Sequence, residues 1–224
     1  MKKIATVRND FKEKFGIPRQ SGLCEDIVSK VVFEPEYRCP EALRGITDFS
    51  HLWLIFEFSK SIRDSWSPTV RPPRLGGNKR VGVFATRSPF RPNPIGLSSV
   101  RLLGLEETPE GTVLLVGGAD LLDGTPIYDI KPYLPYTDSH PDASFGYAKD
   151  AMEYELEVVF PDKLLSKIPS DKQNALKIIL SQDPRPSYIN DADRVYTFRF
   201  ADYEISFTVA DGTLTVTDVR DFIE

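Results

Sequence analysis

The chain has 224 residues, of which 41% are hydrophobic and 27% are charged, and its net charge is -5. This composition is typical of a globular protein with its own core, and it excludes disordered, collagen-like and coiled-coil chains. The N-terminal residues lack the apolar core of a signal peptide, and no apolar run approaches the length of a membrane span, about 20 residues. We therefore expect a cytoplasmic protein that spans no membrane.

Most of the first 150 residues have the pattern of short strands. Residues 26–34 alternate between apolar and other side chains, and the apolar run 52–58 is suited to a buried strand. Only residues 40–44 look helical in this part. Many short strands with hardly any helix predict a barrel or a sandwich. The other predicted strands, each bounded by Gly or Pro, are residues 81–86, 95–105, 112–117 and 126–133.

The pattern changes near residue 150. Residues 151–160 alternate as a strand, and a helix is predicted where Ser170 and Gln173 form a capping box, ending at Pro184. Three further strands, 195–200, 203–209 and 214–219, predict a small antiparallel sheet, with Asp211-Gly212 as a turn. The sequence thus predicts a β-rich main domain over residues 1–155 and a smaller α+β domain over 156–224.

Positive charge is concentrated in one segment. Residues 63–101 contain eight basic side chains and one acidic side chain, a charge of +7, so the remainder of the chain carries -12. Seven of the eight are arginine, which suits phosphate or carboxylate recognition, and six of the 18 prolines make the segment rigid. A basic stripe on an acidic body is expected of a protein that binds a polyanion. The alternative is an ordinary solvated surface.

The sequence lacks the motifs of several common metal, nucleotide and catalytic sites. Cys24 and Cys39 match no zinc spacing, and the chain has only two histidines, so we expect no metal site. There is no glycine fingerprint of a Rossmann site, no phosphate-binding P-loop and no nucleophile elbow.

Two dense segments carry a resemblance. They are residues 82–98, GVFATRSPFRPNPIGLS, and residues 120–133, DLLDGTPIYDIKPY. Supporting segments are 18–20, PRQ; 66–77, WSPTVRPPRLGG; and 183–188, DPRPSY. Together they resemble the TsaA-like, or TrmO, family of S-adenosylmethionine-dependent tRNA methyltransferases, over nearly the whole chain.

The resemblance implies a mainly β fold, a single-sheet antiparallel β-barrel with a smaller C-terminal domain that helps to hold tRNA. It implies S-adenosylmethionine as cofactor. It also implies a homodimer that methylates the exocyclic amine of threonylcarbamoyladenosine, beside the anticodon of threonine tRNA.

Carried onto this sequence, the resemblance implies cofactor contacts in four places: the loop 20–22, Ser59-Lys60, Arg87 with Leu97, and residues 120–123. Ser59-Lys60 departs from the family pattern, because a lysine aimed at a sulfonium would be repelled. The contact there is therefore through backbone, or Lys60 points at the cofactor carboxylate or the RNA. The implied cofactor residues are Gln20, Ser21, Gly22, Ser59, Lys60, Arg87, Leu97, Asp120, Leu121, Leu122 and Asp123.

Each of these residues also has an ordinary structural interpretation. Asp120 and Asp123 suit ribose hydroxyls or the methionine ammonium, yet Asp-Gly-Thr-Pro also makes a good turn. Arg87 suits the cofactor carboxylate, or a surface ion pair. Tyr133 and Tyr136 suit stacking on a base, or packing in a core.

The acceptor nitrogen is conjugated, so removal of its proton should help the reaction. We predict Asp129 as the base, and Lys131 as a residue that orients the acceptor or its threonyl carboxylate. Two rival functions stay open: a non-enzymatic RNA-binding barrel, and a binder of another adenosyl ligand. The predicted tRNA phosphate contacts are Arg71, Arg74, Lys79, Arg80, Arg91 and Arg185.

Overall fold

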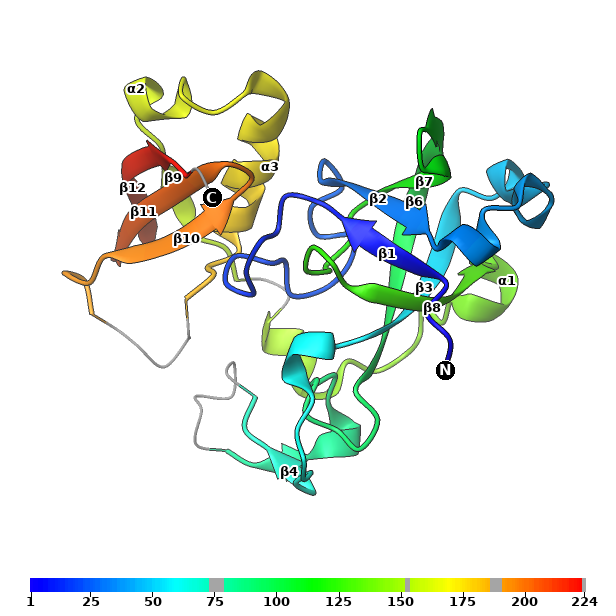
Figure 1. Cartoon of the computed structure of the whole chain (residues 1–224). Coiled ribbons are helices and arrows are strands. Elements are labelled where there is room, and N and C mark those ends of the chain that lie inside the picture. Colours follow the sequence, from blue (N-terminus) through cyan, green and yellow to red (C-terminus); the bar gives the residue numbers. More distant parts are fainter. Residues whose placement is uncertain (73–78, 152–153, 186–190, 223–224) are drawn as a thin grey trace.

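The computed structural model describes residues 1–72, 79–151, 154–185 and 191–222. Figure 1 shows two bodies side by side, a ring of strands and a smaller sheet covered by helices. The fold is mainly β, as the sequence predicts. In the described part of the chain, every helix is too short or too polar to span a bilayer.

Six antiparallel strands form the larger body. Their order is β1-β2-β7-β6-β3-β8, and β1 pairs with both β2 and β8, so the sheet closes on itself as a barrel. No sheet edge is left unpaired by this closure. The strands are β1 (Ala5–Arg8), β2 (Val28–Phe33), β3 (His51–Glu57), β6 (Ile95–Thr108), β7 (Gly111–Gly117) and β8 (Pro126–Pro132).

The strand β3 shows how the sequence builds this barrel. Leu52, Leu54 and Phe56 are buried in the barrel core, so the residues between them face outward. The continuous apolar run predicted a fully buried strand, but Trp53 and Ile55 are only half-buried on the outer face. Trp53 on that outer face lines a surface pocket rather than belonging to the core.

Short elements connect the strands. Residues 81–86, predicted as one strand, divide into β5 (Val81–Gly82) and a 3-10 turn (Val83–Ala85), and β5 pairs with β4 (Thr69–Val70). The strand β1 is not predicted by the sequence at all. The remaining connecting elements are α1 (Pro135–Asp138) and the 3-10 turns Pro35–Tyr37, Pro40–Leu43, Ile46–Asp48, Ser59–Ser61 and Gly146–Ala151.

The smaller body is a four-stranded sheet with helices against it. Its order is β10-β11-β12-β9, and the added strand β9 is parallel to β12. The predicted turn at Asp211-Gly212 joins β11 to β12, and both residues have positive φ. The elements are β9 (Glu157–Val159), α2 (Asp162–Leu165), α3 (Ser170–Ser181), β10 (Tyr196–Phe200), β11 (Tyr203–Ala210) and β12 (Thr213–Asp221).

Two details of the smaller body differ from expectation. Within the predicted strand 151–160, β9 covers Glu157–Val159, and residues 152 and 153 lie outside the described residues. The helix α3 starts at Ser170, but its N-cap is Pro169 with no side-chain cap, so the predicted capping box does not form. The Gln173 amide instead donates to the carbonyls of Leu165 and Ile168, 3.2 and 2.9 Å away. These bonds provide donors for carbonyl oxygens at the end of the preceding turn.

The two bodies are tied together by the segment that follows β1. Phe11, Cys24 and Ile27 are buried in the core of the smaller body, although they lie far from it in sequence. Phe11 packs on Phe200, with ring centroids 6.2 Å apart. Residues 10–27 therefore link the barrel to the smaller body, and the loop that carries Gln20, Ser21 and Gly22 lies within this segment.

Gly96 on β6 offers a test of barrel packing. A Cβ atom there would lie 2.2 Å from the Phe56 ring inside the barrel. We expect Gly96→Ala to lower the free energy of unfolding by about 2 kcal/mol, because overpacking a dense core forces side chains out of place. Gly82→Ala is the matched control, since its Cβ would meet nothing within 4 Å. Urea unfolding of both variants measures the difference, and equal stabilities would contradict the packing described here.

Candidate functional site

Two hollows meet at Arg87. The larger, about 1800 Å³, runs between the smaller body and the described part of the basic segment, residues 63–72 and 79–101, called here the arginine-proline segment. The smaller, about 440 Å³, lies on the outer face of the barrel. Arg87 lines both hollows, and the loop 20–22 lies between them, with Gln20 lining the larger and Ser21 and Gly22 the smaller.

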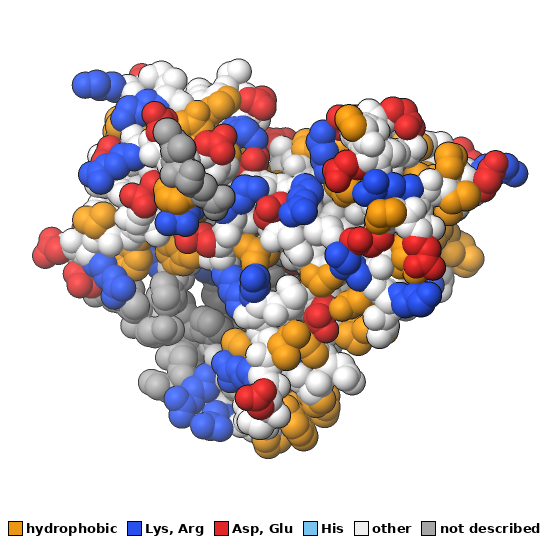
Figure 2. Space-filling view, viewed as in Figure 1, with side chains coloured by type: hydrophobic (Ala, Val, Ile, Leu, Met, Phe, Trp, Pro, Cys, Tyr) orange, Lys and Arg blue, Asp and Glu red, His pale blue; other side chains and the backbone are white. Residues whose placement is uncertain are grey.

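The larger hollow, called here the basic cleft, is rich in arginine. Two acidic side chains, Asp64 and Glu155, line it among the described residues. Figure 2 shows Lys and Arg side chains beside hydrophobic ones at the lower end of this face, near β4 in Figure 1. This surface attracts an anionic partner. The arginines that line it are Arg19, Arg63, Arg71, Arg80, Arg87 and Arg91.

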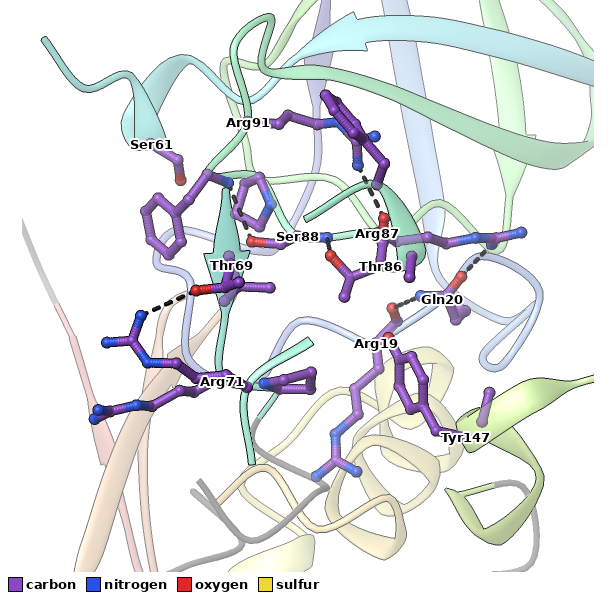
Figure 3. Close-up of a pocket in the computed structure, with 18 of the residues that line it drawn as sticks. Arg19, Gln20, Ser61, Thr69, Arg71, Thr86, Arg87, Ser88, Arg91 and Tyr147 are labelled. Carbon is purple, nitrogen blue, oxygen red and sulfur yellow. Dashed lines mark hydrogen bonds between the residues drawn. The ribbon is translucent and has the colours of Figure 1, made fainter. Parts of the chain in front are cut away.

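The arginine-proline segment is held in shape by its own hydrogen bonds. Arg91 donates to the carbonyl of Thr86 at 2.9 Å (Figure 3). The Thr86 hydroxyl donates to the carbonyl of Val83 at 2.8 Å. The Arg63 guanidinium lies 3.6 Å from the centroid of the Phe90 ring. The segment therefore presents its charges from a preorganised scaffold.

The loop 20–22 is positioned by backbone contacts. Gly22 donates its N–H to the carbonyl of Gly118 at 2.9 Å. Gly118 has φ +74°, and a Cβ there would lie 3.2 Å from the backbone of Gly22, so this approach requires glycine. Figure 3 shows Arg87 and Gln20 pointing toward one another, and the guanidinium donates to the Gln20 side-chain oxygen.

Asp120 lies behind this junction. Its carboxylate accepts a 2.5 Å hydrogen bond from the hydroxyl of Ser98, which is buried inside the barrel. Burial raises the pKa of Asp120, while the hydrogen bond from Ser98, backbone N–H groups and the positive charge of Arg87 oppose that rise. The structure thus gathers Gln20, Ser21, Arg87 and Asp120, four of the predicted cofactor residues, around one point.

Leu97 and the predicted catalytic pair share the outer face of the barrel. Ile55 of β3 is the register partner of both Leu97 on β6 and Asp129 on β8. Because neighbouring strands are about 4.8 Å apart, Leu97 and Asp129 are separated by about 10 Å across the sheet. Lys131 pairs with Asp129 at 2.7 Å, and the other Asp129 oxygen accepts the N–H of Ile130. Leu97 is 54% exposed and lines the smaller hollow.

Other predicted cofactor residues lie elsewhere. Ser59 and Lys60 are absent from the described lining of both hollows, and Lys14 bonds the carbonyl of Lys60 at 2.5 Å. Leu121 is buried in the barrel core. The carbonyl of Leu122 accepts from Thr125.

Asp123 lies beside β1. Its carboxylate accepts the backbone N–H of Asn9 at 3.0 Å and pairs with Lys12 at 3.1 Å. Within the 120–123 segment, Asp120 is the residue whose carboxylate interacts with Arg87 and with the backbone of Ser21, although it is not among the described lining residues of either hollow.

The predicted RNA contacts also divide. Arg71, Arg80 and Arg91 line the basic cleft, and Lys79 is exposed next to Arg80. Arg74 lies outside the described residues.

Arg185 differs from its prediction. Its side chain is 9% exposed and makes a two-pronged ion pair with Asp183, at 2.8 and 3.1 Å. A guanidinium engaged in this way is withdrawn from RNA, so we assign Arg185 a structural role.

Sequence reasoning overlooked several residues here. Arg19 and Arg63 line the basic cleft, and Trp53 and Asp138 line the smaller hollow. Arg63 lies within the basic segment, so charge alone pointed to it. Trp53 sits in an apolar run that resembled a core strand, so no sequence signal separated it from the core.

Comparison with known proteins identifies the family. The model of the N-terminal domain of tRNA-methyltransferase O matches residues 6–139, and the TrmO C-terminal domain model matches residues 153–222. The chain belongs to the TrmO family. A TrmO relative from Escherichia coli, tRNA (adenine(37)-N6)-methyltransferase, is 41% identical, covering 95% of this chain and 94% of its own length.

Other relatives and solved structures agree. The putative S-adenosylmethionine-dependent methyltransferase RcsF of Pseudomonas aeruginosa is 40% identical, covering 90% of this chain and 89% of its own. A crystal structure of TrmO from the same organism superimposes with a TM-score of 0.79 at 35% identity, covering 98% of this chain and 95% of its own. The TrmO fold thus extends over both bodies.

Proposed function

We propose that this protein transfers a methyl group from S-adenosylmethionine to the exocyclic amine of the adenine beside the anticodon of tRNA. We further propose that the acceptor is threonylcarbamoyladenosine in threonine tRNA. The observation that carries the proposal is the meeting of a basic cleft and a small outer-face pocket at Arg87, in a chain whose TrmO relatives are named for this reaction.

The residues at the junction suit the cofactor. A guanidinium at Arg87 matches the cofactor carboxylate, and the Asp120 carboxylate matches the ammonium or a ribose hydroxyl. Leu97 offers an exposed apolar side chain for the adenosyl group. The Asp123 carboxylate is already bound to Asn9 and Lys12, and Ser59-Lys60 is absent from the described lining of both hollows. We therefore leave these residues out of the proposed pocket within one chain.

S-adenosylmethionine supplies an electrophilic methyl group when it is bound. The protein contributes chiefly by alignment, because methyl transfer is an in-line displacement and good alignment lowers the barrier by several kcal/mol. We propose that Asp129 accepts the acceptor proton. Lys131 then binds the carboxylate of the acceptor's threonyl group.

Asp129 gives the test of the proton step. We expect Asp129→Asn to slow single-turnover methylation about 100-fold or more, because an amide cannot act as a base, while cofactor affinity stays the same. Rapid-quench assays with radiolabelled cofactor measure the rate, and calorimetry measures the affinity. A full single-turnover rate would remove Asp129 from the proposed mechanism.

Arg80 gives the test of the RNA surface. Removing a side chain that neutralises one phosphate should reduce the slope of log affinity against log salt by about 0.7–0.9. We expect that change for Arg80→Ala, and for Lys79→Ala, in tRNA titrations across salt concentrations. Arg44→Ala removes the same charge outside the described lining of both hollows and should leave the slope unchanged.

The function is tested by incubating threonine tRNA with protein and cofactor, then analysing its nucleosides by mass spectrometry. A methylated threonylcarbamoyladenosine supports the proposal. Affinity for tRNA without cofactor binding would favour a non-enzymatic RNA-binding barrel. Cofactor binding without a tRNA product would favour a binder of another adenosyl ligand.

Three further features belong to this proposal. We propose a homodimer, supported by the exposed apolar side chains Ile95, Leu103 and Leu105 of β6. The division of the chain near residue 155 is proposed with residues 10–27 as the bridge between the parts. The reaction belongs in the cytoplasm, where its tRNA substrate is found.

A further inference from the structure

The smaller hollow has an aromatic wall that the cofactor contacts do not use. Trp53 and Tyr133 line it, with ring centroids 5.4 Å apart and planes inclined at 46°. Tyr136, the other tyrosine considered for stacking, is 87% exposed and is not part of the described lining. The pair lies on the outer face, where β3 meets the end of β8.

The wall is braced in one orientation. The Trp53 indole donates to the Asp138 carboxylate at 2.8 Å, and the same oxygen accepts the N–H of Leu134 at 2.9 Å. These two hydrogen bonds lower the pKa of Asp138, and the bond from the Leu134 N–H has the larger effect. The carboxylate is thus ionised near neutral pH and holds the indole firmly. Tyr133 is fixed through its backbone N–H, which donates to the carbonyl of His51 at 3.0 Å.

The aromatic wall lies beside the predicted cofactor and catalytic residues on the outer face of the barrel. Trp53 is the register partner of both Ser99 and Lys131, one row along from Leu97, Ile55 and Asp129. The predicted cofactor residue Leu97 and the predicted catalytic pair therefore flank it. The basic cleft and this hollow share Arg87 in their linings.

We propose that Trp53 and Tyr133 form the stacking subsite for the acceptor adenine. This inference rests on the proposed function and adds the residues that hold the base. A base in an RNA loop must leave its stack before it can be modified, and an aromatic surface compensates for the lost stacking, by about 1–3 kcal/mol per base. The RNA backbone lies in the basic cleft, and the adenine passes Arg87 to reach the wall.

The adenine ring of the cofactor is the other source of the same chemistry, so the experiment separates the two. The chain has two tryptophans, Trp53 and Trp66. Trp66→Phe leaves Trp53 as the sole tryptophan, and Trp53→Phe leaves Trp66. Each variant is first saturated with S-adenosylhomocysteine and then titrated with an RNA stem-loop of threonine tRNA, while tryptophan emission is followed.

We expect the RNA to quench Trp53 emission by half or more in Trp66→Phe, and to do so only weakly when uridine replaces the acceptor adenine. Trp53→Ala should weaken RNA binding about tenfold. Trp53→Phe should retain part of that affinity, because it keeps a ring. Urea unfolding of the Trp53 variants checks that they fold.

Two results would overturn the inference. One is quenching that is complete with S-adenosylhomocysteine alone, which would assign the wall to the cofactor. The other is RNA binding to Trp66→Phe with no change in Trp53 emission. If wild-type protein methylates tRNA in either case, the proposed function stands and the subsite alone fails. If wild-type protein forms no methylated nucleoside, the function fails whatever the emission shows.

Discussion

Asp120→Asn is expected to weaken S-adenosylmethionine binding about thirtyfold, which corresponds to about 2 kcal/mol. The substitution keeps the size of the side chain and leaves the Ser98 hydroxyl an oxygen to bond, so the fold should survive. It removes the negative charge that the junction offers to a cationic ligand. Calorimetry at neutral pH measures the change.

The same group sets a pH dependence. Burial holds the pKa of Asp120 above its usual value, so its carboxylate takes up a proton sooner on acidification than an exposed aspartate does. Binding that needs the ionised form is therefore full above this pKa and lost as pH falls through it. We expect the affinity of the wild-type protein for the cofactor to fall as the pH is lowered, and the affinity of Asp120→Asn to show no such fall.

Asp123→Asn separates the two aspartates. The carboxylate of Asp123 bonds the Asn9 N–H and Lys12 beside β1, so we expect lower stability with cofactor affinity retained. If Asp123→Asn weakened cofactor binding as much as Asp120→Asn does, the junction would not be the cofactor site that we propose.

Arg185→Ala is expected to lower the free energy of unfolding by about 3 kcal/mol. The Asp183 carboxylate, 5% exposed, accepts two bonds from the guanidinium and one of 3.0 Å from the Tyr154 hydroxyl. Removing the arginine leaves a buried charge without its counter-ion, which is far more costly than losing a surface pair. Urea unfolding measures the loss.

The chain contains a matched control. Asp218 and Arg220 have the same spacing as Asp183 and Arg185, and they pair at 2.6 Å, but the Arg220 side chain is 73% exposed. Arg220→Ala should therefore change stability by less than about 0.5 kcal/mol. If Arg185→Ala kept full stability and lost RNA affinity, Arg185 would return to the RNA surface.

The Asp183 pair also reaches the functional site. Arg19, next to Gln20, donates to the carbonyl of Asp183, so the smaller body is linked to the loop at the junction of the two hollows. We expect Arg185→Ala to weaken cofactor binding as well, because the loop loses this support. This effect acts through position and not through charge.

Short-range patterns were sufficient for most strands. Residues 26–34 alternate with period two because one face of β2 must meet the barrel core, and Val31 and Phe33 are buried there as predicted. The turn at Asp211-Gly212 follows from local backbone preference, since both residues tolerate positive φ. The 17-residue arginine-proline motif was specific enough to indicate the family.

Contacts between distant segments decided the rest. The strand β1 has four residues and exists because β2 and β8 pair with it on both sides. The predicted capping box failed for a local reason, because Gln173 found acceptors in the preceding turn, five and eight residues away. For β1, local propensity was weaker than its pairing with strands distant in sequence.

By itself, the sequence determined the mainly β fold, the concentration of arginine on one segment, and the family with its implied cofactor. The tertiary structure alone decided which charged groups are available to a ligand. Arg185 is withdrawn by Asp183 and Asp123 by Lys12, whereas Arg87 lines both hollows and its charge acts on the buried carboxylate of Asp120. The reason is that the chemistry of a charged side chain depends on its burial and its nearest partner, and both are set by residues remote in sequence.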